Sequence, residues 1–164
     1  MAIENPYQKI IELLDEHEIT YRALTHKAVF TSAEADAVRP ADVTISQGAK
    51  ALLLKTGDEF MLFVLPGDRK LNMQKVRQVA GVNRIRFATK EEVVEVMGCE
   101  VGACYPIGKI CGIKTYVDKT LSENHQVAFN AGDHSKSIIM KYPDYIAITD
   151  PVMCDISSNE KITR

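Results

Sequence analysis

The sequence predicts a mixed α/β fold, in which a single domain holds a mixed, largely antiparallel sheet or a partly closed barrel, flanked by helices. The chain has 164 residues, the length of one ordinary domain. Its 46% hydrophobic and 26% charged residues are typical of a protein with a buried core. Helical and strand-like segments alternate along the chain. A short turn joins two of the strands, so the sheet cannot be all parallel.

Four segments carry helix signals. Asn5 and Pro6 combine an N-cap with a proline at the first helical position, which predicts a helix from there to about Glu18. Thr89 and Glu92 form a capping box, which opens a helix that ends at Gly98. Two further helices are predicted over Ser32–Val38, which Pro40 ends, and Met73–Ala80, which Gly81 ends.

The clearest strands are Ala49–Lys55 and Glu59–Leu65, which flank a glycine-containing turn over residues 56–58. Both are nearly continuous apolar runs, which predicts that both of their faces are covered. The polar segment from Pro151 onward is expected to be a loose tail. Further strands are predicted over Thr20–Leu24, Arg84–Ala88, Ile113–Val117, Val127–Ala131, Ser137–Lys141 and Tyr145–Thr149.

The charge and cysteine patterns exclude several classes of protein. The net charge of −2 provides no global positive field, so any contact with RNA has to use a local patch. Cys99, Cys104, Cys111 and Cys154 lack the spacing of a metal site, so neither a metal nor a cofactor is expected. No signal-peptide pattern is present, and no segment approaches the ~20 apolar residues of a membrane span. We therefore expect a cytoplasmic protein with reduced cysteines and no membrane association.

Lys50 is the first candidate functional residue, because it stands at the head of an apolar strand after the small residues Gly48 and Ala49. A lysine ammonium group can bind a carboxylate, a phosphate or a developing oxyanion. A lysine at this position can also simply extend its charge to solvent, and the spacing alone favours that interpretation.

Two turns are further candidates. Gly102–Pro106 is a tight turn whose backbone amides can bind an anion or a carbonyl oxygen, although a purely structural turn also explains the pattern. Asn130–Ser135 is a polar turn between two apolar strands, and a hairpin suffices to explain its backbone. Asp133 and His134 in this turn are placed where their side chains can reach a pocket.

Cys104 raises the alternative of a thiol nucleophile. Such a mechanism needs a base in contact with the sulfur, and the sequence does not show whether His125 or His134 lies near it. The chain contains no P-loop, dinucleotide fingerprint, nucleophile elbow or zinc-protease motif, which excludes most nucleotide-binding, hydride-transfer, esterase and metalloprotease classes.

In their order and spacing, these features resemble one family. Lys50 resembles an invariant lysine at a strand start, and Leu65–Val76 resembles the turn and helix that follow it. Gly102–Pro106 matches a Gly-x-x-x-Pro loop, and Phe129–His134 resembles the last turn of the pocket. The chain thus resembles the YbaK and prolyl-tRNA synthetase-associated editing domain family, over a core of about residues 7–150 in a single domain of residues 1–164.

The resemblance implies a freestanding aminoacyl-tRNA deacylase, a trans-editing hydrolase that cleaves the ester between a wrong amino acid and tRNA, often tRNA for proline. It implies catalytic roles for Lys50, Gly102 and His134, with Lys50 holding the terminal phosphate or positioning the tRNA end. The implied substrate-binding residues are Ala103, Cys104, Tyr105, Pro106, Asn130, Gly132 and Asp133. The reaction would use a substrate hydroxyl and an ordered water, with no cofactor, metal or enzyme nucleophile.

The implied partner is the acceptor end of an aminoacylated tRNA, and an aminoacyl-tRNA synthetase is a further candidate. A pocket closed by Cys104, Tyr105 and His134 predicts that small amino acids such as alanine, serine or cysteine are removed. Two alternatives remain open at this point. The first is a non-catalytic module that binds aminoacyl-tRNA or a small ligand, and the second is a small-molecule hydrolase that uses Cys104.

Overall fold

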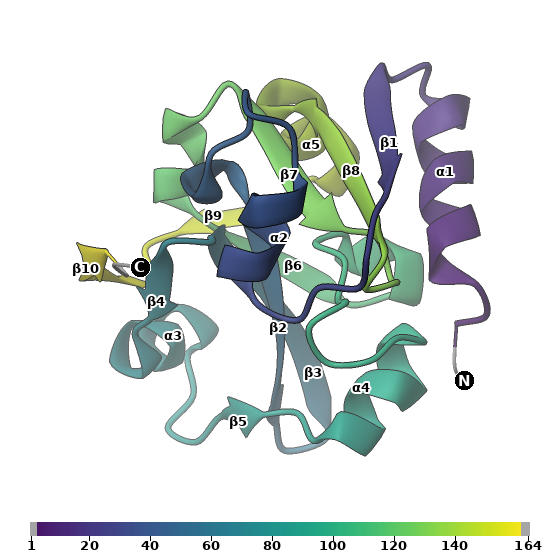
Figure 1. The fold of residues 1–164 in the computed structure, drawn as a ribbon. Coiled ribbons are helices and arrows are strands. Elements are labelled where there is room, and N and C mark those ends of the chain that lie inside the picture. The colour runs from purple at the N-terminus through teal and green to yellow at the C-terminus, as the bar shows by residue number, and fades with distance from the viewer. Residues whose placement is uncertain (1–2, 162–164) are drawn as a thin grey trace.

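The structure, a computed structural model, describes residues 3–161 (Figure 1). Its largest sheet has the strand order β5-β2-β3-β6-β9. Strand β2 pairs antiparallel with β3 and β5, whereas β3 with β6 and β6 with β9 are parallel, so the sheet is mixed as predicted. Its strands are β2 (Ala49–Thr56), β3 (Glu59–Pro66), β5 (Arg86–Phe87), β6 (Lys114–Asp118) and β9 (Val152–Cys154).

Two smaller antiparallel sheets complete the strands. One has the order β1-β8-β7, built from β1 (Tyr21–Thr25), β8 (Lys136–Lys141) and β7 (Gln126–Asn130). The other pairs β4 (Arg69–Leu71) with β10 (Ser157–Lys161). A single parallel bridge between Gly48 and Ala128 links the start of β2 to β7. The sheets remain open in the part of the chain that is described, so the predicted alternative of a partly closed barrel is not adopted.

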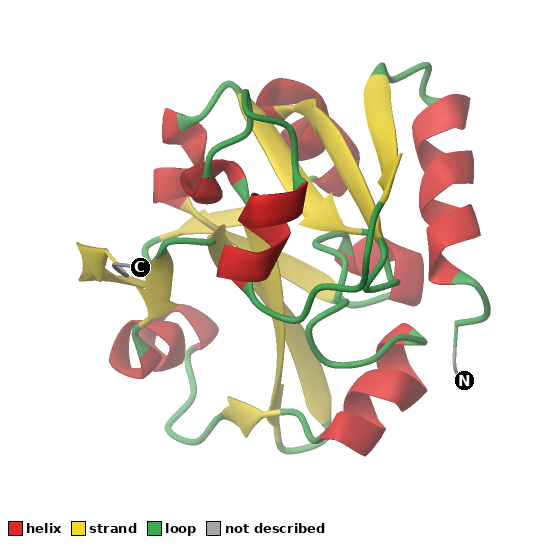
Figure 2. Ribbon diagram, in the orientation of Figure 1, coloured by secondary structure: helices red, strands yellow, loops and turns green. Residues whose placement is uncertain are grey.

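Helices surround the strands (Figure 2). They are α1 (Pro6–Glu16), α2 (Ser32–Val38), α3 (Met73–Ala80), α4 (Lys90–Met97) and α5 (Tyr142–Thr149), with short 3-10 turns over Ile45–Gln47, Gly108–Cys111 and Lys119–Glu123. The predicted caps form: Asn5 accepts from the amide of Gln8, and Thr89 and Glu92 make a reciprocal capping box. None of the helices within residues 3–161 is long and apolar enough to cross a bilayer.

Strand β3 is buried on both faces and separates two hydrophobic clusters. Leu62 faces the larger cluster, which contains Ile10 of α1 and residues from the β1-β8-β7 sheet. Phe63 points the other way, into a smaller cluster with Val76 of α3 and Ile156. The apolar run of β3 is nearly continuous because both faces of the strand are covered, as predicted from the sequence.

The C-terminal third differs from expectation in two places. The segment Tyr145–Thr149, predicted as a strand, belongs to helix α5. Pro143 opens this helix, and Tyr145, Ile148 and Thr149 are its buried residues, at the spacing of one helical face. Short apolar runs do not distinguish a buried strand from a buried helix, which explains the error.

The segment after Pro151, predicted as a loose tail, forms β9 and β10 instead. The carboxylate of Asp118, fully buried at the end of β6, holds it. Its oxygens accept from the amides of Ile156 (2.8 Å) and Ser157 (3.1 Å) and from the Ser157 hydroxyl (3.1 Å). The hydroxyl of Thr120 also donates to it. A polar tail is thus ordered by one buried acceptor that lies about forty residues away in sequence.

We predict that Asp118→Ala lowers the free energy of unfolding by roughly 3 kcal/mol, because it leaves several buried donors unpaired. Asp155→Ala is the matched control. Asp155 binds Lys75 and Lys119 at the surface, and such exposed pairs contribute less than about 1 kcal/mol. Urea unfolding of both variants checks the prediction, and equal losses would show that Asp118 does not anchor the C-terminal strands.

Candidate functional site

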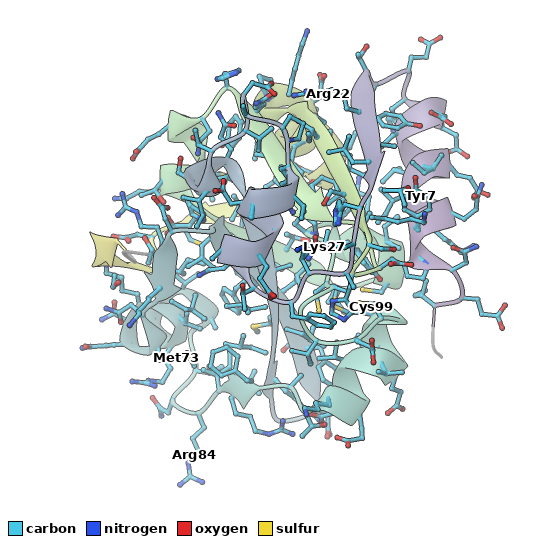
Figure 3. The ribbon with its side chains drawn as sticks, in the orientation of Figure 1. Tyr7, Arg22, Lys27, Met73, Arg84 and Cys99 are labelled. Atoms are coloured by element: carbon cyan, nitrogen blue, oxygen red, sulfur yellow. The ribbon has the colours of Figure 1, made fainter. Side chains whose placement is uncertain are left out.

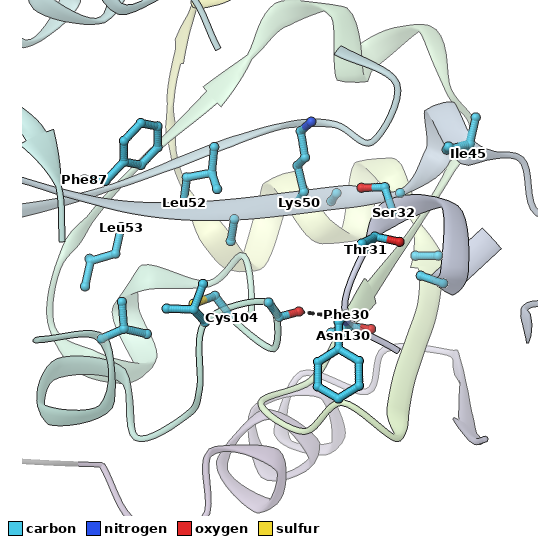
Figure 4. A pocket seen from close by; sticks show the side chains of 18 of the residues that line it. Phe30, Thr31, Ser32, Ile45, Lys50, Leu52, Leu53, Phe87, Cys104 and Asn130 are labelled. Carbon is cyan, nitrogen blue, oxygen red and sulfur yellow. Dashed lines mark hydrogen bonds between the residues drawn. The ribbon is translucent and has the colours of Figure 1, made fainter. Parts of the chain in front are cut away.

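A pocket of about 490 Å³ opens along the edge of β2 (Figure 4). Its walls come from α2 and the segment before it, from β2, from the end of β5, and from the Gly102–Pro106 turn after α4, which we call the glycine loop. The predicted site residues that line it are Lys50, Gly102, Cys104 and Asn130. The structure therefore brings the lysine, the Gly102–Pro106 turn and the first residue of the polar turn, Asn130, to one cavity.

The pocket exists where β2 lacks a neighbouring strand. On the side away from β3, β5 pairs only with Leu54 and Lys55, and the amide of Ala88 adds one bond to the carbonyl of Leu53. From Ala49 to Leu52 this edge has no strand partner within the described residues. An unpaired edge presents backbone donors and acceptors to whatever lies against it. The pocket thus offers both side chains and main-chain groups to a ligand.

Lys50 is half-buried at this edge and makes no hydrogen bond or ion pair within residues 3–161. In Figure 4 its side chain extends to the same side of β2 as Leu52, whereas Leu53 points to the other side, toward Cys104.

Burial lowers the pKa of Lys50, and Lys70 acts in the same direction, while Asp68 partly offsets both. Asp68 is itself buried, and its Oδ1 has no partner there. The site thus holds a cation that the protein does not neutralise by contact.

The glycine loop is held in place from β7 and α2. Gly102 has a φ of +92°, and its carbonyl accepts from the Asn130 side chain at 2.8 Å. The Oδ1 of Asn130 accepts in turn from Arg39 at the end of α2 (3.3 Å), and Arg39 also donates to Ser137 (3.4 Å). This chain of contacts connects the glycine loop to two elements distant in sequence.

Arg39 lines the pocket and was missed by the sequence analysis. Burial lowers its pKa to about 10, although Asp36 acts in the opposite direction. The guanidinium group therefore stays charged at neutral pH and is the second cation at the pocket. A single arginine before a proline carries no motif, so only the position of α2 against β7 reveals it.

His134 and its neighbours do not line the pocket. The Nδ1 of His134 donates to the carbonyl of Val29 (2.9 Å), and its ring packs on Phe30 with the centroids 4.3 Å apart. A Cβ on Gly102 would lie 3.3 Å from its Cε1. His134 thus supports the glycine loop and Phe30 from behind, and Asp133 caps its own turn by accepting from Ser135.

The rest of the predicted binding loop is buried and structural in its contacts. The Tyr105 hydroxyl donates to the carbonyl of Met97 (2.9 Å), and the carbonyl of Pro106 accepts from Tyr145 (2.6 Å). The carbonyl of Ala103 accepts from the amide of Gly132 (3.0 Å). These residues fix the loop that carries Gly102 and Cys104 and do not reach the pocket themselves.

Cys104 lines the pocket beside a second buried thiol. A hydrogen bond from Cys99 lowers the pKa of Cys104, while burial acts in the opposite direction. The hydrogen bond to Cys104 and burial raise the pKa of Cys99. Neither His125 nor His134 contacts this pair in the described structure, so no base is in place to activate the sulfur. No group of three His, Cys, Asp or Glu side chains there is arranged to hold a metal ion.

We predict that Lys50→Met raises the free energy of unfolding by on the order of 1 kcal/mol at pH 7, as expected when a functional site is held at a cost in stability. The lowered pKa of Lys50 already includes the attraction of Asp68, so its surroundings disfavour the charge overall. The gain should be complete below the folded-state pKa. It should disappear as the pH rises through that pKa toward the ordinary 10.5, because the wild-type lysine then becomes neutral.

Urea unfolding at several pH values measures this gain, with the exposed Lys9→Met as the control that should change nothing. A loss of stability at pH 7 for Lys50→Met would mean that the ammonium group is already well satisfied in the folded protein.

Several known proteins are similar to this chain. Over 150 residues it is 32% identical to the multifunctional Ser/Thr-tRNA deacylase ProXp-y of Escherichia coli (strain K12), covering 88% of this chain and 89% of that protein. It is 37% identical over 90 residues to a proline–tRNA ligase of Halalkalibacterium halodurans, covering 55% of this chain and 16% of the ligase. The solved structure of a hypothetical protein, APE2540, superposes with a TM-score of 0.81 at 28% identity, over 92% of this chain and 99% of that one.

A candidate trans-editing enzyme for prolyl tRNA synthetase shares the fold, with a TM-score of 0.81 at 20% identity over 96% of this chain and 100% of that one. The family model described as the aminoacyl-tRNA editing domain matches residues 26–148. That range contains Lys50, the glycine loop and His134, which carry the resemblance seen in the sequence. The chain therefore belongs to the aminoacyl-tRNA editing domain family.

Proposed function

We propose that this protein is a freestanding hydrolase that deacylates mischarged aminoacyl-tRNA carrying a small amino acid. The single observation that carries the proposal is Lys50, a half-buried ammonium group without a bonded partner at an open strand edge of the pocket. A half-buried ammonium group that no carboxylate contacts can stabilise a phosphate or a developing oxyanion that binds beside it. The similarity to the Escherichia coli relative, a Ser/Thr-tRNA deacylase, supports the same reaction class.

In the proposed reaction, water adds to the carbonyl carbon of the ester, and the bond between that carbon and the ribose oxygen breaks. The amino acid leaves as the free acid, and the ribose oxygen takes up a proton. An aminoacyl ester is already activated, so positioning and stabilisation of the oxyanion supply most of the catalysis. We assign Lys50 to the terminal phosphate and the tRNA end, and the backbone at Gly102 to the ester carbonyl or the ribose edge.

Three residues take supporting roles in this proposal. Asn130 holds the carbonyl of Gly102, and Arg39 holds Asn130 while its charge faces the pocket. His134 acts as a positioning residue behind Gly102, because its own contacts turn it away from the cavity. The earlier expectation that His134 closes the amino-acid pocket is therefore revised.

The side of the pocket near Cys104 is suited to a small amino-acid side chain. Ala49, Ala51, Leu53 and Cys104 line the pocket and pack in the same hydrophobic cluster, so they provide an apolar surface there. Because the Escherichia coli relative is a Ser/Thr-tRNA deacylase, seryl and threonyl esters are the first candidates, followed by alanyl esters of similar size. Similarity to part of a proline–tRNA ligase makes tRNA for proline, and association with a synthetase, further parts of this proposal. We place the protein in the cytoplasm, where these substrates are found.

Lys50→Met is expected to reduce kcat/KM for deacylation of seryl-tRNA at least 100-fold, a loss of about 2.7 kcal/mol of transition-state stabilisation. Methionine keeps an unbranched side chain of nearly the same length but has no ammonium group, so the charge and its hydrogen-bond donors are removed. Deacylation of radiolabelled seryl-tRNA measures the effect, with Lys9→Met on the outer face of α1 as the control. Retention of most of the wild-type rate by Lys50→Met would contradict the role assigned to the ammonium group.

Cys104→Ser distinguishes this mechanism from a thiol-dependent hydrolase within the same assay. We expect it to keep the rate within a few-fold, since no base contacts the sulfur. A loss above ~99% would instead support a covalent mechanism. A wild-type protein that binds seryl-tRNA without cleaving it would favour the non-catalytic binding module.

Specificity should follow size. We expect seryl- and alanyl-tRNA to be deacylated at least 100-fold faster than phenylalanyl-tRNA, because the pocket excludes the large ring sterically. Favourable apolar contacts alone discriminate by only about 1–3 kcal/mol per methylene. His134→Ala should lower all three rates and leave their ratio unchanged, since His134 is not part of the pocket wall. Parallel deacylation assays check both statements. A selective increase in the rate on phenylalanyl-tRNA in His134→Ala would show that His134 does form part of the pocket wall.

A further inference from the structure

A basic surface lies beyond the pocket, at the far end of β2. Two adjoining hollows of about 410 and 350 Å³ share Arg77 of α3 and Asn83 in their walls. Lys55, Arg84 and Arg86 line the first hollow as well, and neither wall contains a carboxylate among the described residues. We call this surface, defined by Lys55, Arg77, Arg84 and Arg86, the basic hollow. Its charge contrasts with the net −2 of the whole chain.

The four cations of the basic hollow are not equivalent. Glu92 of α4 binds both Lys55 (3.0 Å) and Arg86 (2.7 Å). The hydrogen bonds that Glu92 accepts from Arg86, from the Thr89 backbone and from Lys55 hold its pKa well below the usual range.

Arg77 and Arg84 make no side-chain hydrogen bond or ion pair within residues 3–161. Asp58 and Glu59 lie at the adjacent hairpin turn but are not part of the walls. Arg77 and Arg84 are thus the cations available to an outside anion.

Strand β5 connects the basic hollow to the pocket. Arg86 belongs to the hollow, and the next residue, Phe87, lines the pocket with 51% of its surface exposed. In Figure 4 the ring of Phe87 lies beside Leu52, on the same side of β2 as Lys50. Figure 3 shows Arg84 extending away from the body of the protein at the start of this segment. A continuous path therefore runs from Lys50 over an exposed aromatic ring to unpaired arginines.

The opposite rim of the pocket is less suited to a polyanion. Phe30 is also exposed there, but its amide donates to the carboxylate of Glu34 (3.1 Å). Its ring packs on His134, whose Nε2 lies 3.4 Å from Glu100, and the Glu100 side chain is 79% exposed. Carboxylates beside Phe30 would repel phosphates, whereas arginines beyond Phe87 would attract them.

We propose that the single-stranded end of the tRNA leaves the pocket over Phe87, and that Arg77 and Arg84 bind phosphates of the acceptor stem beyond it. The proposal rests on the proposed function. An exposed aromatic ring followed by basic side chains is the arrangement by which proteins bind single-stranded nucleic acid without reading its sequence. Contacts with phosphates position the nucleic acid and provide most of the salt-dependent affinity.

The test compares Arg77→Glu/Arg84→Glu with Lys9→Glu/Lys141→Glu, a control that reverses two charges at exposed positions away from the pocket. Each protein is assayed on full-length seryl-tRNA and on the seryl ester of the trinucleotide CCA. We expect the arginine variant to raise KM for the tRNA about 10- to 100-fold with kcat unchanged, and to treat the trinucleotide as wild type does. The slope of log affinity for uncharged tRNA against log salt should fall by roughly 1.5–2.

Phe87→Ala is expected to raise KM about tenfold on both substrates, because the trinucleotide still passes over the ring. The proposed path is overturned if the arginine variant matches wild type on tRNA, or if it weakens both substrates equally. If the wild type cleaves neither substrate, the proposed function fails. Binding of uncharged tRNA, followed by fluorescence anisotropy, then still decides whether Arg77 and Arg84 contact RNA.

Discussion

The unpaired edge of β2 is the constraint on which the rest of the site depends. Because β5 is only two residues long, it covers β2 at Leu54 and Lys55 and leaves Ala49 to Leu52 without a neighbouring strand. A longer β5 would fill the cavity with a strand, whereas the short one leaves main-chain groups facing a space of about 490 Å³. The bridge from Gly48 to Ala128 closes one end of the gap, and Phe87 closes the other. An edge that would otherwise favour aggregation is enclosed, and its main-chain groups remain available to a ligand.

The glycine loop faces this edge because distant parts of the chain hold it there. Asn130 from β7 binds the carbonyl of Gly102, and Arg39 from the end of α2 binds Asn130. Behind the loop, His134 fills the space that a side chain at Gly102 would need. Deeper in the core, Tyr105 and Tyr145 donate to main-chain carbonyls on either side. The loop is therefore held at its backbone, which suits a site that binds substrate through amides and carbonyls.

Charge is distributed so that a nearly neutral protein can bind a polyanion locally. Lys50 and Arg39 line the pocket, and burial lowers the pKa of both. The folded protein therefore holds these two charges at a cost in stability. Lys55 and Arg86 share Glu92 and so contribute mainly to structure. A net charge near zero removes long-range attraction, so the affinity for tRNA that we propose has to come from local contacts with unpaired cations.

Local patterns in the sequence predicted the fold class, the first four helices, the central hairpin, and the candidate residues Lys50 and Gly102 that line one pocket. Each of these depends on local signals: caps, apolar runs, turn residues and a recognisable order of motifs. Packing between distant elements makes Tyr145–Thr149 helical and orders the segment after Pro151, because helix α5 packs against the sheet and buried Asp118 holds that segment. It also decided that Arg39 faces the pocket and His134 does not. The direction of a side chain from a loop depends on which distant elements pack around it, and no local pattern in the sequence encodes that packing.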